Sequence, residues 1–162
     1  MPNVRKKNRL EMFLYKEWYF FVTINVQNHE CVFWEVVGEE MKSNQYGKIV
    51  EECWYDLPNH YWNCELLDLI IMPNHLHAVI GVEGGVGEGL KPSLTKKYWL
   101  SEMLRGFKTF SSRKLHEAWL TSFKRQRSFY DHIIRNEQDL LRIQEYIQLN
   151  PYKRKNDEYY MW

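Results

Sequence analysis

Two kinds of residue pattern run along the chain, and together they predict seven elements of secondary structure. Segments rich in aromatic and β-branched residues predict strands, and apolar residues at helical spacing predict helices. The predicted strands span residues 18–27, 62–71 and 75–82, with a fourth inside residues 120–134. The predicted helices span residues from about 43 to 58, from 98 to about 115, and from 137 to 149.

The order of these elements, β-α-β-β-α-β-α, predicts an α+β fold. Its first six elements match a ferredoxin-like split βαβ unit, in which two helices cover one face of a single antiparallel sheet. The last helix is additional to this unit, so it is free to cross the other face of the sheet. A length of 162 residues favours a single domain covering residues 1–162.

Two histidines separated by one leucine, His75 and His77, stand inside the predicted strand 75–82. Side chains two residues apart on a strand share a face, so both imidazoles project from one side of the sheet, close enough to bind one metal ion. Leu76, Ala78 and Ile80 point the other way, into a predicted core. The alternative is that the histidines decorate a solvated sheet face and bind nothing.

The last predicted helix carries further polar candidates. Tyr146 and Asn150 are four residues apart, so they share one helix face. Leu140, Ile143 and Ile147 form an adjacent apolar stripe that can dock the helix on the sheet. Tyr146 would then lie beside the histidine pair, and Asn150 could offer a carbonyl oxygen as a third metal ligand. The alternatives are that Tyr146 is a packing residue and Asn150 a helix cap before the following proline.

The net charge of +1 conceals a separation of charge along the chain. Residues 10–83 carry 12 acids and 3 bases, a net charge of −9, whereas residues 91–135 carry 11 bases and 3 acids, a net charge of +8. Several aromatic residues lie among these bases. Since bases bind phosphates and rings stack on unpaired nucleobases, this segment suits single-stranded nucleic acid. The alternative is that most of the rings belong to the core and most of the charges to solvated helix faces.

The composition argues against several other classes of protein. No apolar run approaches the length of a membrane span, and the basic N-terminus is not followed by the apolar region of a secretory signal. The three cysteines are odd in number and widely spaced, which argues against a disulfide framework or a zinc knuckle. We therefore expect a cytoplasmic protein.

Three motifs, in this order, resemble the REP-associated tyrosine transposases, which are relatives of the HUH single-tyrosine transposases of small bacterial insertion sequences. The first is His75-Leu76-His77 with the preceding Met72-Pro73-Asn74, and the second is the Phe-Tyr-Asp-His segment 129–136. The third is Tyr146-Ile147-Gln148-Leu149-Asn150-Pro151. Arg9-Leu10 and Phe107-Lys108 also fit, so the resemblance covers nearly the whole chain. The histidine pair alone is a weak signal, whereas the ordered combination is specific.

The resemblance implies a metal-dependent transposase that cleaves and rejoins single-stranded DNA next to a REP-like palindromic hairpin. It implies that His75 and His77 bind a divalent metal ion, Mg²⁺ or Mn²⁺, with Asn150 as the third ligand. It also implies that Tyr146 is the nucleophile and forms a 5′-phosphotyrosine. Imidazole ligands favour Mn²⁺ over Mg²⁺. Contacts with DNA are expected from Arg9, Lys108, Lys124, Arg125, Arg127, Arg135, Lys153 and Arg154.

The chain departs from the family pattern at two places. Arg125 stands where the family often carries a tryptophan. After Asn150-Pro151 the family tends toward Val-Lys-His, whereas this chain has residues Tyr152-Lys153-Arg154. The insertion-sequence relatives work as homodimers that exchange the tyrosine helix, and the REP-associated members tend to act as monomers, so both states stay open.

Two other functions also stay open at the level of the sequence. A protein with this fold could bind a DNA hairpin without cleaving it. Alternatively, a metal-dependent nuclease could use His75, His77 and His132 as ligands and water as its nucleophile.

Overall fold

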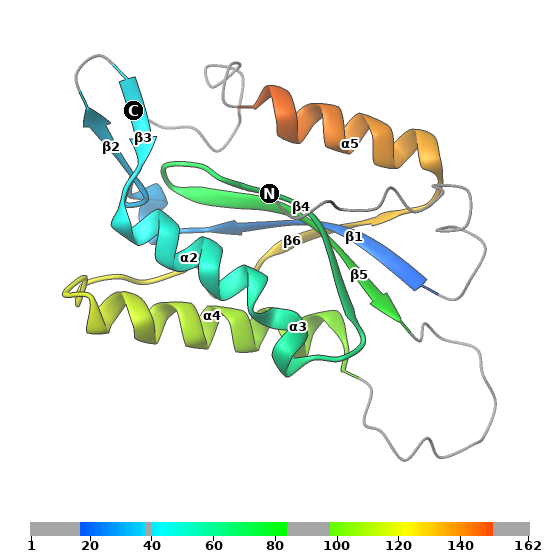
Figure 1. Ribbon diagram of the computed structural model, residues 1–162, viewed down its shortest axis with the longest axis horizontal. Coiled ribbons are helices and arrows are strands. Elements are labelled where there is room, and N and C mark those ends of the chain that lie inside the picture. The colour runs from blue at the N-terminus through cyan, green and yellow to red at the C-terminus, as the bar shows by residue number, and fades with distance from the viewer. Residues whose placement is uncertain (1–16, 38–39, 84–97, 151–162) are drawn as a thin grey trace.

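The central sheet of the molecule lies between two layers of helices (Figure 1). The computed structural model describes residues 17–37, 40–83 and 98–150. The strands of the sheet are β1 (Glu17–Asn25), β4 (Cys64–Ile71), β5 (His75–Glu83) and β6 (Tyr130–Ile134). The helices are α2 (Gln45–Tyr55), α3 (Leu57–His60), α4 (Leu100–Glu117) and α5 (Glu137–Leu149), with a 3-10 turn η1 (Gln27–His29) after β1.

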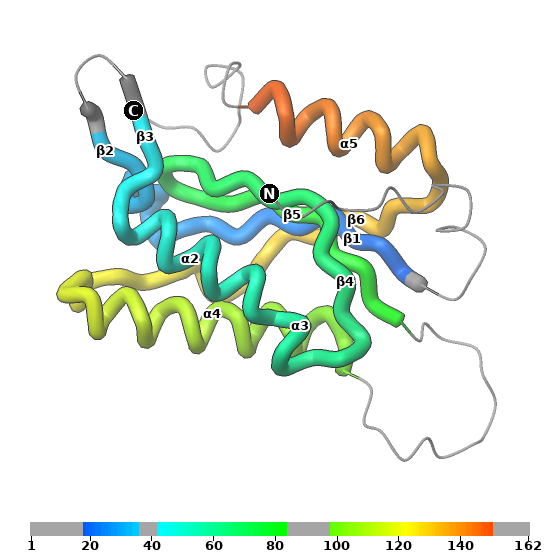
Figure 2. The backbone as a smooth tube through the Cα atoms, in the orientation of Figure 1, coloured from blue at the N-terminus to red at the C-terminus, as the bar shows by residue number. Residues whose placement is uncertain are grey.

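The strand order of the sheet is β4-β5-β1-β6, and every neighbouring pair is antiparallel. This order confirms the predicted α+β fold with an antiparallel sheet. Because β5 lies between β1 and β4, helix α2 connects two strands that are not neighbours, which is the split arrangement that the sequence predicts. Figure 2 shows the backbone of α5 on one side of the sheet and those of α2, α3 and α4 on the other.

Apolar side chains from both faces of the sheet form two separate cores. The larger one, which we call the major core, packs Val22, Ile24 and Ala78 of the sheet against Trp54 of α2 and Phe107 of α4. The smaller one, the minor core, lies on the opposite face and is formed by Tyr19, Val79, Ile134, Leu140 and Ile147. Alternation along β1 and β5 sends successive residues to one core or the other.

A two-stranded hairpin precedes the first long helix, and the sequence did not predict it. It consists of β2 (Trp34–Val37) and β3 (Glu40–Ser43). The predicted helix start near residue 43 is therefore wrong by two residues, because Ser43 ends a strand, Asn44 is the N-cap and α2 begins at Gln45. The Asn44 side chain accepts hydrogen bonds from the backbone N–H groups of Tyr46 and Gly47, which fixes the first turn of α2.

Helix α4 is amphipathic and lies along the major core. It buries Met103, Phe107 and Leu115 and exposes Arg105 and Arg113 on its outer side. None of the helices within the described ranges has both the length and the apolar surface that crossing a membrane requires.

Candidate active site

The histidine pair of β5 lies on the sheet face that α5 covers. His75 and His77 are 0% and 1% exposed, and their Nε2 atoms are 3.1 Å apart. The alternative that these histidines decorate a solvated face is therefore wrong. Their burial follows from the alternation of β5, which sends Leu76 and Ala78 into the major core and turns both imidazoles to the opposite face.

A polar partner holds the second nitrogen of each imidazole. Thr23 Oγ1 lies 2.8 Å from His77 Nδ1, and Asn74 Oδ1 lies 2.6 Å from His75 Nδ1. Asn74 also donates from Nδ2 to the carbonyl oxygen of His29 at 3.3 Å, so its oxygen is the atom that faces His75. Such partners commonly orient the histidine ligands of metal ions. Thr23 could not be predicted as part of the site, because the β1–β5 register that sets it opposite His77 is a tertiary feature.

The two facing Nε2 atoms suit a shared cation. Because Asn74 Oδ1 is an acceptor, His75 donates from Nδ1, and its Nε2 then carries a lone pair in the neutral ring. His77 Nε2, 3.1 Å away, can donate a proton to this lone pair or, in its other tautomer, turn a second lone pair toward a shared cation. Metal–imidazole bonds of about 2.1 Å allow one ion to contact both nitrogens at this separation. The donor set therefore fits a divalent transition ion.

Tyr146 of α5 reaches the same point from above the sheet. Its hydroxyl oxygen lies 3.2 Å from His77 Nε2, and its ring meets the His77 ring in an edge arrangement, with centroids 5.2 Å apart. Phe21 of β1 contacts the tyrosine ring edge-on at 6.0 Å between centroids. The side chain is nevertheless 41% exposed. The hydroxyl thus lies between a buried imidazole and a surface that a large substrate can approach.

The position of Tyr146 depends on how α5 docks. Leu140 and Ile147 are 1% and 4% exposed in the minor core, and Ile143 packs beside them, which confirms the predicted packing stripe. Gln144 adds a polar contact, since its Nε2 donates to Asp68 Oδ2 of β4 at 2.7 Å. These contacts fix the rotation of the helix about its axis.

Asn150 directly follows the last residue of α5 and is 3% exposed. Its backbone keeps helical angles, φ −57° and ψ −43°, in spite of the proline that follows it in the sequence. Tyr146 and Asn150 therefore share a helix face. Asn150 Nδ2 is buried and has no hydrogen-bond partner within the described part of the chain. Since the oxygen and nitrogen of an amide are assigned from their partners, this side chain can turn its oxygen toward a cation.

The part of the chain that the structure describes offers no third His, Cys, Asp or Glu ligand beside the histidine pair. Across residues 17–37, 40–83 and 98–150, no group of three His, Cys, Asp or Glu side chains could hold a metal ion. The set His75, His77 and His132 is therefore not assembled, and the nuclease hypothesis built on it is not supported. A third protein ligand would come from another residue type, and the Asn150 amide is such a group.

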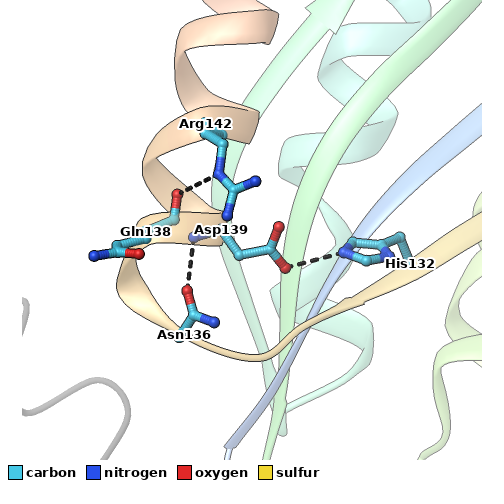
Figure 3. A network of polar contacts seen from close by, with 5 residues as sticks. All are labelled: His132, Asn136, Gln138, Asp139 and Arg142. Carbon is cyan, nitrogen blue, oxygen red and sulfur yellow. Dashed lines mark hydrogen bonds and ion pairs between the residues drawn. The ribbon is translucent and has the colours of Figure 1, made fainter.

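His132 of β6 has a different partner. Its Nε2 lies 3.0 Å from Asp139 Oδ2 in the first turn of α5, and the Asp139 backbone N–H donates to the capping oxygen of Asn136 (Figure 3). The hydrogen bond from His132 holds the pKa of the Asp139 carboxyl below its usual range. This network joins the start of the tyrosine-bearing helix to the edge strand of the sheet.

We expect Asp139→Asn to lower the free energy of unfolding by roughly 0.5–1 kcal/mol at neutral pH, because a partly exposed charge is lost from the helix start and from His132. The depressed pKa makes this contribution fully present above about pH 4 and removes it as the pH falls through the folded-state value. Urea titrations of both proteins at several pH values measure the difference. Glu137→Gln is the matched control from the same helical turn, and an equal loss there would contradict a specific role for the His132 bond.

Lys108 was predicted to contact DNA, but its ammonium group contacts the protein itself. Its Nζ donates to the carbonyl oxygens of Gln126 and Arg127, both at 2.7 Å, and of Ser128 at 3.3 Å. Burial lowers the pKa of this lysine, with a smaller contribution from nearby Arg125. Its three donors bind three carbonyl oxygens, so Lys108 links segment 126–128 to α4. We therefore do not include Lys108 in the proposed DNA interface.

Arg125 was also predicted to contact DNA, and it too points inward. Its guanidinium carbon lies 5.1 Å from the ring centroids of Phe107 and Phe123 and 5.7 Å from that of Phe33. Its Nη2 donates to Ser111 Oγ at 3.0 Å. Burial lowers the pKa of Arg125 to about 9, so the group stays protonated at neutral pH. Cation–π contacts with these three rings stabilise this largely buried charge.

The remaining predicted DNA contacts divide into two groups. Lys124, Arg127 and Arg135 are exposed and remain available to a polyanion. Arg9, Lys153 and Arg154 lie outside the described residues.

Comparison with solved structures gives the class of the fold. A REP-associated tyrosine transposase bound to a REP hairpin superimposes with a TM-score of 0.60, over 95% of this chain and 74% of that one, at 18% sequence identity. A candidate transposase from Deinococcus radiodurans R1 gives a TM-score of 0.54, over 91% of this chain and 96% of that one, at 15% identity. The chain therefore has the α+β fold of these transposases over nearly its whole length.

A sequence relative then gives the family. A Haemophilus influenzae Rd protein that carries the name "Uncharacterized protein" is 32% identical over 174 aligned positions, covering 97% of this chain and 93% of the relative. The chain belongs to the same family as this Haemophilus protein. No protein-family profile matches the chain.

Proposed function

We propose that the protein is a metal-dependent transposase that cleaves and rejoins single-stranded DNA near a palindromic hairpin. The observation that carries the proposal is the 3.2 Å separation between the Tyr146 hydroxyl and His77 Nε2, within a single chain. The Tyr146 hydroxyl lies beside the imidazole nitrogens, and the partial exposure of the tyrosine lets a substrate reach it. This arrangement within one chain favours a monomer that acts in cis over a dimer that exchanges its tyrosine helices.

The proposed reaction is a pair of transesterifications. The Tyr146 oxygen attacks the scissile phosphorus, the bond from phosphorus to the 3′ oxygen breaks, and that oxygen leaves as a free 3′-hydroxyl after taking up a proton. The phenolic proton is lost, and the new bond is a 5′-phosphotyrosine. A 3′-hydroxyl then attacks the phosphotyrosine and restores both the DNA and the phenol. No ATP is needed, because the ester bond is conserved throughout.

His75, His77 and Asn150 would hold a divalent metal ion, with Mn²⁺ or Mg²⁺ as the proposed species. When bound, such an ion withdraws electron density from the phosphate oxygens and offsets developing charge. Thr23 and Asn74 keep the two imidazoles oriented for it through their Nδ1 contacts. Phe21 holds the tyrosine ring edge-on, so that the hydroxyl stays beside the His77 nitrogen.

The proposed partner is a DNA strand that carries a hairpin. The transposase with a TM-score of 0.60 to this chain was solved with a REP hairpin, which supports the same class of ligand here. Lys124, Arg127 and Arg135 are exposed bases that could contact its backbone. Arg9, Lys153 and Arg154, which lie outside the described residues, are further proposed contacts.

The test uses a single-stranded hairpin oligonucleotide labelled at either end and incubated with the protein and Mn²⁺. The proposal predicts that the 3′-end label becomes covalently attached to the protein, because a 5′-phosphotyrosine retains the downstream fragment. The 5′-end label should be released on a fragment with a free 3′-hydroxyl. Denaturing gel electrophoresis distinguishes the two products.

Other outcomes of this experiment support the other functions. Cleavage with both labels released from the protein would favour a nuclease that uses water. Salt-sensitive binding without cleavage in any divalent metal would favour a hairpin-binding protein that keeps the fold and has lost the reaction. Either outcome contradicts the proposed transesterase.

A further inference from the structure

A basic groove runs along the outer side of α4, on the opposite side of the sheet from Tyr146. It has a volume of about 990 Å³ and lies between α4 and segment 125–129. Its lining includes Arg105, Arg113 and Arg127, which are exposed, and a single acid, Glu117. The Lys108 contacts with carbonyls 126–128 hold the second wall of the groove against the helix.

The exposed cations of this groove are poorly neutralised. Arg113 lies 3.8 Å from Glu117, but both side chains are about two-thirds exposed, at 64% and 67%, so this ion pair is weak. Neither Arg105 nor Arg127 forms an ion pair with any residue that the structure describes. A groove with three exposed guanidinium groups and one carboxylate favours a polyanion, and guanidinium groups pair well with phosphate oxygens.

An exposed tryptophan stands at the end of α4, two residues after Glu117. Trp119 is 89% exposed and has a φ of 72°, in the left-handed region. The Leu120 N–H closes the helix end on the carbonyl of Leu115 at 3.0 Å. Glycine usually occupies this position, because a side chain there costs about 1–2 kcal/mol. An indole that is exposed and stands on strained backbone contributes little to folding, which favours a role in binding a ligand.

We propose that this groove and Trp119 bind a single strand of nucleic acid, with phosphates on Arg105, Arg113 and Arg127 and an unpaired base stacked on the indole. Base stacking on an aromatic ring requires an exposed base face, which a duplex interior lacks. The inference rests on the proposed function, which identifies the strand as DNA. The groove would bind a part of that strand away from the cleaved bond. The surface is separate from the catalytic one, because α4 and α5 lie on opposite faces of the sheet (Figure 1).

The test measures binding of a fluorescein-labelled oligothymidylate by anisotropy, in EDTA and in a Tyr146→Phe background so that no cleavage occurs. Trp119→Gly should weaken binding roughly 5- to 100-fold, and Trp119→Phe should retain most of the affinity. The glycine variant should unfold at the same temperature or a higher one, because glycine suits this φ. Trp18→Ala removes a tryptophan that is 41% exposed on β1, and it should leave affinity unchanged.

The phosphate contacts have a separate readout. Arg105→Ala or Arg127→Ala should each reduce the slope of log affinity against log salt by about 0.7, the value for one phosphate on a single strand. Unchanged affinity in Trp119→Gly would overturn the proposal. A shift in oligomeric state of that variant, with affinity unchanged, would assign Trp119 to a protein interface and overturn it as well. The wild-type protein incubated with labelled hairpin DNA and Mn²⁺ tests the proposed function separately: absence of an adduct there would count against that function, whereas the anisotropy measurements in EDTA decide on the groove alone.

Discussion

Replacing Tyr146 with phenylalanine is expected to reduce the covalent protein–DNA adduct by at least about 10³-fold, because the variant lacks the only atom proposed to attack phosphorus. The phenylalanine ring keeps its edge contacts with Phe21 and His77, so the fold should persist. One partly exposed hydrogen bond is lost, and the expected cost in stability is about 1 kcal/mol. A denaturing gel with 3′-end-labelled DNA measures the adduct.

Tyr130→Phe is the matched control for this substitution. Tyr130 belongs to β6 and pairs with Thr23 across the strands, and it is 53% exposed. We expect this variant to form the adduct at the wild-type rate. Persistence of the adduct in Tyr146→Phe together with its loss in Tyr130→Phe would transfer the nucleophile to β6 and refute the proposed site.

Removal of either imidazole is expected to weaken Mn²⁺ binding on the order of 100-fold or more, since loss of a mere orienting partner already costs 10- to 100-fold in typical metal sites. His75→Ala and His77→Ala test this by isothermal titration calorimetry without DNA. Both side chains are buried, so His77→Gln provides a variant of similar volume if alanine impairs folding. Thr23→Val should give a smaller loss, because it leaves both ligands and removes only the partner of His77 Nδ1.

His132→Ala is the control for the metal measurement. His132 belongs to the same sheet but is bonded to Asp139, and it is not part of any three-ligand group in the structure's described ranges. Its removal should leave Mn²⁺ affinity unchanged and lower stability slightly. Wild-type affinity in both His75→Ala and His77→Ala would show that the pair is not the metal site.

The periodicity of the sequence was sufficient to predict which side chains share a surface. A period of two along β5 predicts that His75 and His77 point away from the core residue Leu76, and the structure confirms it. A period near four in α5 predicts the stripe that docks this helix. Both are local properties of the backbone, so they are fixed before any tertiary contact forms.

Features that depend on register or on a turn could not be predicted in the same way. Arg125 lies among bases in the sequence, yet an isolated bridge to Val26 turns its side chain inward, toward the rings of the major core. The strands β2 and β3 are four residues each, too short for a clear period. The left-handed backbone of Trp119 also has no signal in a sequence that lacks glycine there.

The alternation of β1 and β5 has a consequence for how this protein can evolve. Each strand contributes to the candidate site with one set of residues and to the major core with the residues between them. Insertion or deletion of a single residue within either strand would exchange the two sets, turning residues of the candidate site into the core and core side chains toward the candidate site. Substitutions on one face leave the other intact. A point substitution can therefore change the candidate site alone, whereas a change in the length of either strand alters the site and the core at once.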